Sequence, residues 1–304
     1  MRKLIAGAAA VLLLTSGALA QSPPAPRPGV VAVTMRNVRY HFTGRIAVHI
    51  YGLTGRLTPT GQNPFPIFDD ARSFVLHVDA ADMSLTTQAM SSILNDYVFA
   101  APDAPLKNIS IAAGGNTLKI TGKLHSKGDI PFEEEGVLSL TPQGEIRIHS
   151  NKVRAAHLPV KGLMDLLGVD ISDLVSTSKI HGVRAEKDDL LLNPQEILPL
   201  PRIEGRLTSI ELKGNLILEH FGKRLPALPS GNYMTYRGGR LRFGKLTMDN
   251  TDMESIDLDP RDPFDFWLAH YKEQLVAGYT KTTPAFGLRV FMRDYNKLGG
   301  KRNR

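Results

Sequence analysis

The chain has 304 residues, of which 42% are hydrophobic and 22% are charged, close to the averages of ordinary globular proteins. It contains no cysteine, which excludes disulfide bonds, a thiol nucleophile, a lipoprotein anchor and cysteine-ligated zinc. The formal net charge of +7 favours anionic partners. Lysine and arginine are spread along the chain, however, so nucleic-acid binding is not expected.

The first twenty residues have the three-part layout of a secretory signal peptide. Arg2 and Lys3 precede an apolar run from Leu4 to Leu14, and Ala18-Leu19-Ala20 is a small-residue cleavage pattern just before Gln21. The apolar run is shorter than the roughly 20 residues that a bilayer span requires. We therefore predict cleavage and a periplasmic or secreted protein, whose most accessible anionic partner is a lipid headgroup surface.

From about residue 31 the dominant pattern is an alternation of apolar and polar residues, typical of antiparallel strands with one buried and one solvated face. Residues 137–140 and 146–148 flank Thr141-Pro142-Gln143-Gly144, which predicts a hairpin. The clearest alternation spans 210–219, with Gly214 as a bulge or bend. Its expected shared face consists of Ile210, Leu212, Leu216 and Leu218.

Three segments switch to helical spacing. The first covers 85–98 with Ser84 as its N-cap, and the second covers 160–175. The third begins at Asp262-Pro263 and is expected to run to Leu275. The first two apolar stripes either fill a conventional core or line a cavity. The candidate lining of an apolar groove is Met90, Ile93, Leu94, Leu163, Met164 and Leu167 on the helices, with Leu212 and Leu216 on the strands.

Short motifs between residues 80 and 222 occur in a familiar order. Pro131 and Phe132 precede a strand led by Gly136, and three prolines bracket the segment before a later strand. These prolines are Pro194, Pro199 and Pro201. In this order the motifs resemble those of the LmeA-type family of exported phospholipid-binding proteins, which is related to the tubular lipid-binding (TULIP) domains. The resemblance implies an α+β fold in which a strongly curved antiparallel sheet, a half-barrel, wraps around apolar amphipathic helices and leaves a groove for acyl chains.

Common catalytic and cofactor motifs are absent. The chain has no G-x-S-x-G, H-E-x-x-H, Walker or G-x-G-x-x-G sequence, and no histidine pair at helical spacing to hold a metal. We therefore expect no catalytic residue, no cofactor and no metal. The best remaining candidate for such a site is the acidic stretch 249–265, although it lacks EF-hand spacing. Its acidic residues are Asp249, Asp252, Glu254, Asp257, Asp259, Asp262 and Asp265.

The sequence thus predicts an exported, non-enzymatic lipid-binding protein that holds a phospholipid or similar amphiphile at the cell envelope. A membrane surface is a further candidate partner. The expected organisation is a signal peptide (1–20), a proline-rich linker (21–30), a lipid-binding-like α+β domain (31–229) and a C-terminal segment (230–304) that continues or caps that domain. One alternative is an envelope scaffold with a filled core that binds a protein partner. Another is an envelope hydrolase that uses the acidic stretch around Asp257.

Overall fold

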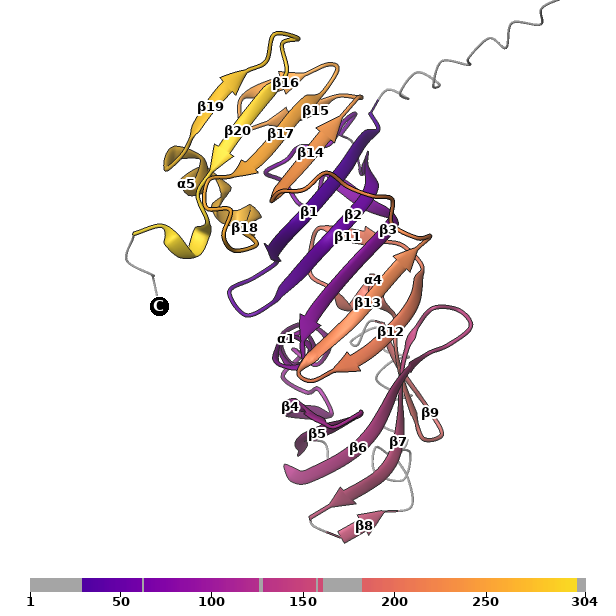
Figure 1. Ribbon diagram of the computed structural model, residues 1–304. Coiled ribbons are helices and arrows are strands. Elements are labelled where there is room, and N and C mark those ends of the chain that lie inside the picture. The colour runs from indigo at the N-terminus through magenta and orange to yellow at the C-terminus, as the bar shows by residue number, and fades with distance from the viewer. Residues whose placement is uncertain (1–28, 62, 126–127, 157, 161–181, 300–304) are drawn as a thin grey trace, which may run out of the picture.

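A computed structural model describes residues 29–61, 63–125, 128–156, 158–160 and 182–299 (Figure 1). The described chain forms an elongated, β-rich molecule with few helices, in which a large open sheet and a smaller sheet follow one another along the long axis. The expected signal peptide lies outside the described residues. So does the helix expected over 160–175, apart from Val160, which ends a short strand.

The larger sheet has eleven strands in the order β12-β13-β3-β2-β1-β14-β17-β20-β19, with β11 beside β3 and β18 beside β1. Its strands pair antiparallel, except for β11 with β3, β18 with β1 and β17 with β20, which pair parallel. Their bounds are β1 (Val31–His41), β2 (Ala47–Pro59), β3 (Phe74–Thr86), β11 (Arg202–Glu204), β12 (Leu207–Lys213), β13 (Leu216–Gly222), β14 (Tyr233–Arg237), β17 (Asp252–Asp257), β18 (Phe264–Trp267), β19 (Tyr279–Thr282) and β20 (Leu288–Met292).

Strand β1 sits at the centre of this sheet and shares one of its edges between two partners. Residues 32–36 pair with β14, whereas residues 38–41 pair with β18. Asn37 stands at the changeover with φ of 50°, a left-handed conformation that asparagine tolerates better than most residues. The Asn37 side chain donates from Nδ2 to Asn232 Oδ1 at 2.7 Å, and its Oδ1 lies 2.9 Å from His49 Nε2. This local turn lets the C-terminal residues from β14 onward extend the same sheet.

The smaller sheet has seven strands, all antiparallel, in the order β4-β5-β6-β7-β10-β9 with β8 beside β7. The predicted hairpin over 137–148 is confirmed, because β6 and β7 pair across the turn in which Gly144 has φ of 88°. The strand bounds are β4 (Leu106–Gly114), β5 (Thr117–Leu124), β6 (Ile130–Leu140), β7 (Ile146–Ala155), β8 (Leu158–Val160), β9 (Val183–Glu186) and β10 (Asp189–Leu192). A separate two-stranded sheet pairs β15 (Leu241–Phe243) with β16 (Leu246–Met248).

The described helices are short. The first predicted helix is confirmed with a later start, because residues 85 and 86 still belong to β3 and Thr86, not Ser84, caps α1 by accepting from the Ala89 N–H at 3.0 Å. None of the described helices is long and apolar enough to cross a membrane. Their bounds are α1 (Thr87–Ile93), η1 (Leu94–Val98), α4 (Pro194–Ile197), η3 (Leu268–His270), α5 (Tyr271–Val276) and η4 (Tyr295–Lys297).

The third helix was predicted to start at Pro263, and this is wrong for its first part. Residues 264–267 form β18, in which Phe264 and Phe266 are both almost fully buried at strand spacing. Helical structure begins only at Leu268. Residues 264–267 pair with residues 38–41 of β1. This distant pairing overrides the local preference of Asp262-Pro263 for starting a helix.

The predicted shared face over 210–219 is also wrong for its second half. Gly214, with φ of 57°, belongs to a two-residue turn between β12 and β13, and Leu212 pairs with Ile217 across it. Because paired residues lie on the same face of the sheet, even-numbered residues such as Leu212 point inward before the turn and odd-numbered residues such as Ile217 point inward after it. On β13 the inward positions are Ile217, Glu219 and Phe221, whereas Leu216 is exposed.

One cluster of buried apolar side chains runs through both sheets. Helix α1 packs on β4 and on the end of β3, and β12 contacts β6, so the two sheets are joined at these two places. The result is a large sheet whose inner face meets α1, α4 and the segment that leads into β11.

Candidate functional site

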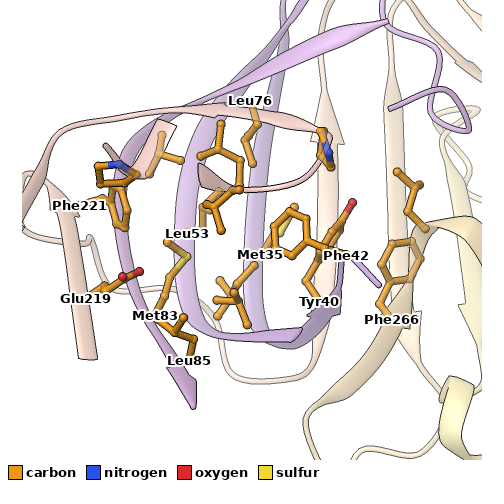
Figure 2. A pocket seen from close by; sticks show the side chains of 18 of the residues that line it. Met35, Tyr40, Phe42, Leu53, Leu76, Met83, Leu85, Glu219, Phe221 and Phe266 are labelled. Atoms are coloured by element: carbon orange, nitrogen blue, oxygen red, sulfur yellow. The ribbon is translucent and has the colours of Figure 1, made fainter. Parts of the chain in front are cut away.

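An apolar cavity lies on the inner face of the large sheet (Figure 2). It crosses the sheet from β13 through β3, β2 and β1 to β14 and β18, and is closed by α1 and residues 194–203. Glu219 is the only one of the lining residues with a carboxyl group, and the lining contains no lysine, arginine or histidine. The lining consists of Met35, Tyr40, Phe42, Val48, Ile50, Leu53, Leu57, Phe68, Phe74, Leu76, Val78, Met83, Leu85, Met90, Ile93, Ile146, Pro194, Ile197, Leu198, Pro201, Ile203, Glu219, Phe221, Tyr236, Phe266 and Leu268.

Local sequence signals position the walls of this cavity. Alternation along β2 and β3 directs side chains such as Leu53 and Leu76 inward. On the opposite side, Asn193 caps α4 by accepting from the Gln195 N–H at 3.1 Å, and Pro194 occupies the first helical position. The covering segment is therefore held by its own cap and turns its apolar residues toward the sheet.

The cavity is narrow, with a volume of about 70 Å³. A cavity of about 150 Å³ is large enough for benzene, so an alkyl chain would have to displace side chains in order to enter here. Met35, Met83 and Met90 are all in the lining. Methionine has three rotatable bonds and adapts its shape more readily than branched residues. These three side chains can therefore change shape at the wall without a change of the backbone.

Aromatic rings form the end of the cavity near β14 and β18. Phe68 packs edge-on against Tyr236 and Phe266 with ring centroids 5.5 and 6.1 Å apart. Burial raises the pKa of Tyr40 and Tyr236, so both phenols stay neutral. The Tyr236 hydroxyl donates to Met234 Sδ at 3.7 Å. This end offers two uncharged hydroxyl groups in an otherwise apolar wall.

Glu219 is the one carboxyl group in the lining, and Figure 2 shows it beside Met83 and Phe221 at the end opposite to Phe266. It exposes only 9% of its surface, and burial raises the pKa of this carboxyl from 4.5 to about 7. Sequence reasoning missed it, because a continuous strand through Gly214 would turn it toward solvent. A two-residue turn at Gly214-Asn215 was the signal that could have found it.

The residues predicted to line a groove fall into three groups. Met90 and Ile93 lie together in the cavity wall. Leu94 is buried in the core but does not line the cavity, Leu212 is half-buried on β12, and Leu216 is 37% exposed. The others, Leu163, Met164 and Leu167, lie outside the described residues. Eleven of the lining residues belong instead to β1, β2 and β3.

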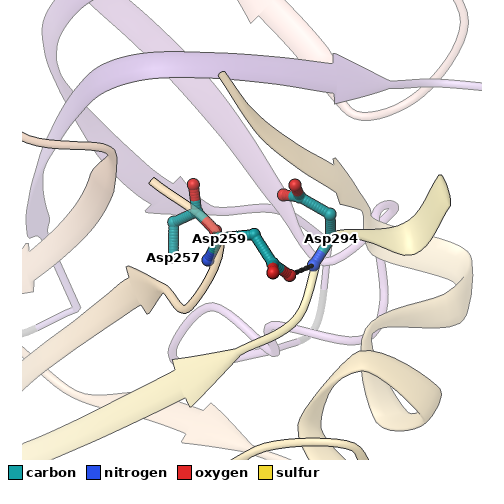
Figure 3. A group of neighbouring side chains, drawn as sticks. All are labelled: Asp257, Asp259 and Asp294. Atoms are coloured by element: carbon teal, nitrogen blue, oxygen red, sulfur yellow. Dashed lines mark hydrogen bonds between the residues drawn. The ribbon is translucent and has the colours of Figure 1, made fainter. Parts of the chain in front are cut away.

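The acidic stretch places three carboxylates together at the C-terminal end of the molecule (Figure 3). Asp257 ends β17, Asp259 follows it and Asp294 comes after β20, and one oxygen of each lies within 4.8 Å of the others. Burial raises the pKa of Asp257 and of Asp294. Three oxygen ligands at this spacing are the type of set that can hold a hard cation.

These carboxylates already have donors. Asn232 Nδ2 donates to Asp257 Oδ2 at 2.8 Å, and the Asp265 N–H donates to Asp294 Oδ1 at 2.8 Å. Lys297 Nζ lies 2.8 Å from Asp294 Oδ2. The cluster therefore ties the ends of β17, β18 and β20 together. This structural role explains the three carboxylates, and no bound cation is needed to explain them.

The remaining acidic residues of the stretch are dispersed into separate contacts. Each is paired with a different basic side chain. The pairs are Asp249 with Arg240, Asp252 with Arg237, Glu254 with Arg289, Asp262 with Lys297 and Asp265 with His41. The stretch is thus a set of separate side-chain pairs around the small three-carboxylate cluster.

Comparison of the chain with known protein-family models and with curated proteins gave no match.

Proposed function

We propose that this chain is an exported, non-enzymatic lipid-binding protein that holds the acyl part of a phospholipid or similar amphiphile at the cell envelope. The observation that carries the proposal is the cavity on the inner face of the large sheet, whose lining is apolar apart from Glu219 and the two tyrosine hydroxyls. The three-part pattern of the first twenty residues supports export. We further propose that the large sheet corresponds to the curved half-barrel of the LmeA-type and TULIP proteins that the sequence resembles.

Transfer of methylene groups supplies the driving force for this activity. Each buried CH₂ gains about 0.8 kcal/mol, so a chain of eight to twelve carbons gains several kcal/mol without any reactive residue. Part of this gain is needed to rotate side chains, because the cavity encloses only about 70 Å³. The methionines of the wall keep that cost low.

Filling the cavity tests the proposal. Met83 faces the cavity from β3, and Met83→Trp places an indole where the acyl chain of the lipid would lie. We expect protein purified without detergent to yield co-extracted lipid by mass spectrometry, and we expect Met83→Trp to lower the lipid recovered per protein about fivefold or more. Leu216→Trp, on the exposed face of β13, is the matched control and should load as the unmodified chain does.

Thermal unfolding of both variants verifies that they are folded. Absence of lipid from the folded unmodified chain would overturn the proposal. So would equal loading of the folded Met83→Trp protein.

The scaffold alternative has one observation in its favour. Strand β19 is at the edge of the large sheet and is exposed along its whole length, and Val276 and Phe286 on either side of it expose 84% and 95% of their surfaces. An open edge with apolar neighbours can pair with a strand of another protein. Val276→Asp combined with Phe286→Asp would remove such binding in a pull-down and would leave lipid loading unchanged if the two functions are separate.

A further inference from the structure

Glu219 is the most unusual group of the cavity, because it is a buried carboxyl group without a partner. Within the described parts of the chain, no hydrogen bond or ion pair reaches it. Burial of a polar group without a hydrogen bond costs free energy, and a charged one costs more. A structural carboxylate would have donors around it, as those of the C-terminal cluster do.

The strand register explains why nothing in the sheet satisfies this group. Glu219 pairs with Met83 on β3 and with Ile210 on β12, and its inward neighbours along β13 are Ile217 and Phe221. All four are apolar. The carboxyl group therefore faces the cavity, where Figure 2 shows it, with an apolar frame on the sheet side.

The charged side chains of the neighbouring strands lie on the other face of the sheet. His220 on β13 pairs with Asp82 on β3 at 2.6 Å, and Glu211 and Lys213 on β12 are exposed. His77 on β3 lies 3.2 Å from Glu204 of β11. The other carboxylates near the closing segment also have partners, since Glu196 accepts from Asn193 and Glu145 pairs with Arg184.

We propose that Glu219 is the polar anchor of the cavity and that it recognises a hydrogen-bond donor on the bound amphiphile, a hydroxyl or an ammonium group, and discriminates against a carboxylate at that point. This inference rests on the proposed lipid-binding function and specifies the ligand class. An oxygen of Glu219 accepts a hydrogen bond from either donor. A ligand carboxylate at the same place offers no proton and repels the ionised side chain.

The pKa of about 7 fits this role, because the carboxyl group changes between its acid and carboxylate forms near neutral pH. Either form has an oxygen that can accept from a hydroxyl group. Only the carboxylate form adds the attraction of opposite charges to an ammonium ligand. The response to pH therefore separates the two donors.

Calorimetric titration with three ligands of one chain length tests the assignment, using octan-1-ol, octylamine and octanoate at pH 8 with the full chain. We expect octanol or octylamine to bind at least about tenfold more tightly than octanoate. In Glu219→Leu this preference should fall at least about fivefold, since the acceptor and its charge are gone and only the cost of burying the octanoate charge remains. Glu211→Leu on the exposed face of β12 is the matched control and should keep the full preference.

The outcomes separate the two proposals. If none of the three ligands binds the folded unmodified chain, both the lipid-binding function and the anchor are overturned. If all three bind with similar affinities, or if Glu219→Leu keeps the preference of the unmodified chain, the anchor alone is overturned. Glu219→Gln, which retains an acceptor oxygen, should keep octanol binding within about threefold but lose the additional affinity for octylamine at pH 8.

Discussion

Two of the places where the described chain buries carboxyl groups differ in what surrounds those groups. Asp257 and Asp294 at the C-terminal end accept hydrogen bonds from Asn232 and from a backbone N–H, and Asp294 also pairs with Lys297. Glu219 in the cavity has no such donor from the described chain. The comparison teaches that burial and a raised pKa do not by themselves mark a binding site, because both places have them. A structural carboxylate has hydrogen-bond donors of the protein around it, whereas a carboxylate without such donors can accept from a ligand.

Removing a partnered carboxylate should have the largest effect on stability. Asp294 is fully buried, so Asp294→Ala leaves the Asp265 N–H without an acceptor and Lys297 without its closest counter-ion. We expect a loss of about 2 to 4 kcal/mol in the free energy of unfolding by urea titration. Asp249→Ala, in the exposed pair with Arg240, should stay within about 0.5 kcal/mol of the unmodified chain. A loss of less than about 1 kcal/mol for Asp294→Ala would contradict the structural role of the cluster.

Neutralising the unpartnered carboxyl group of Glu219 should raise the free energy of unfolding at high pH, whereas removing Asp294 lowers it. The folded-state pKa of Glu219 is about 7 against an ordinary value of 4.5, so between these values the unfolded chain binds fewer protons than the folded chain. This group therefore lowers stability as pH rises from about 4.5 through 7, after which its contribution stays constant.

For that reason Glu219→Gln should gain about 2 to 3 kcal/mol relative to the unmodified chain between pH 4.5 and pH 8. The raised pKa values of Asp257 and Asp294 act in the same direction but are common to both proteins and cancel in the difference. Glu211→Gln is the control and should follow the unmodified chain. A difference between Glu219→Gln and the unmodified chain that does not change with pH would show that Glu219 is solvated or partnered in solution.

The sequence predicted those parts of the fold that depend on neighbours along the chain. The hairpin over 137–148 has its turn residues between two alternating segments, and α1 has a regular apolar stripe, so both could be found locally. The strand at 264–267 could not, because it forms only by pairing with residues 38–41, far away along the chain. Local propensity at Asp262-Pro263 indicated a helix, and the distant pairing determines the structure instead.

The candidate site shows the same division. Met90 and Ile93 were predicted from helical spacing alone. Glu219 depended on one turn, because reading 210–219 as a single strand instead of two places every residue after Gly214 on the opposite face. The alternation pattern of β1, β2 and β3 identifies strands but does not say which apolar side chains border an empty volume. That property arises from the packing of α1 and residues 194–203 over the sheet.

The most direct test of lipid binding uses the methionine methyl groups as reporters. Met35, Met83 and Met90 line the cavity, whereas Met253 and Met292 are fully buried elsewhere. With ¹³C-labelled methionine methyl groups, addition of a short-chain phospholipid below its micelle concentration should shift the signals of the first three, with direct contacts to the acyl chain. Met253 and Met292 should stay unchanged. If the methyl signals of all five stay unchanged at saturating lipid, or only those outside the cavity shift, the cavity is not a lipid site and the central proposal is contradicted.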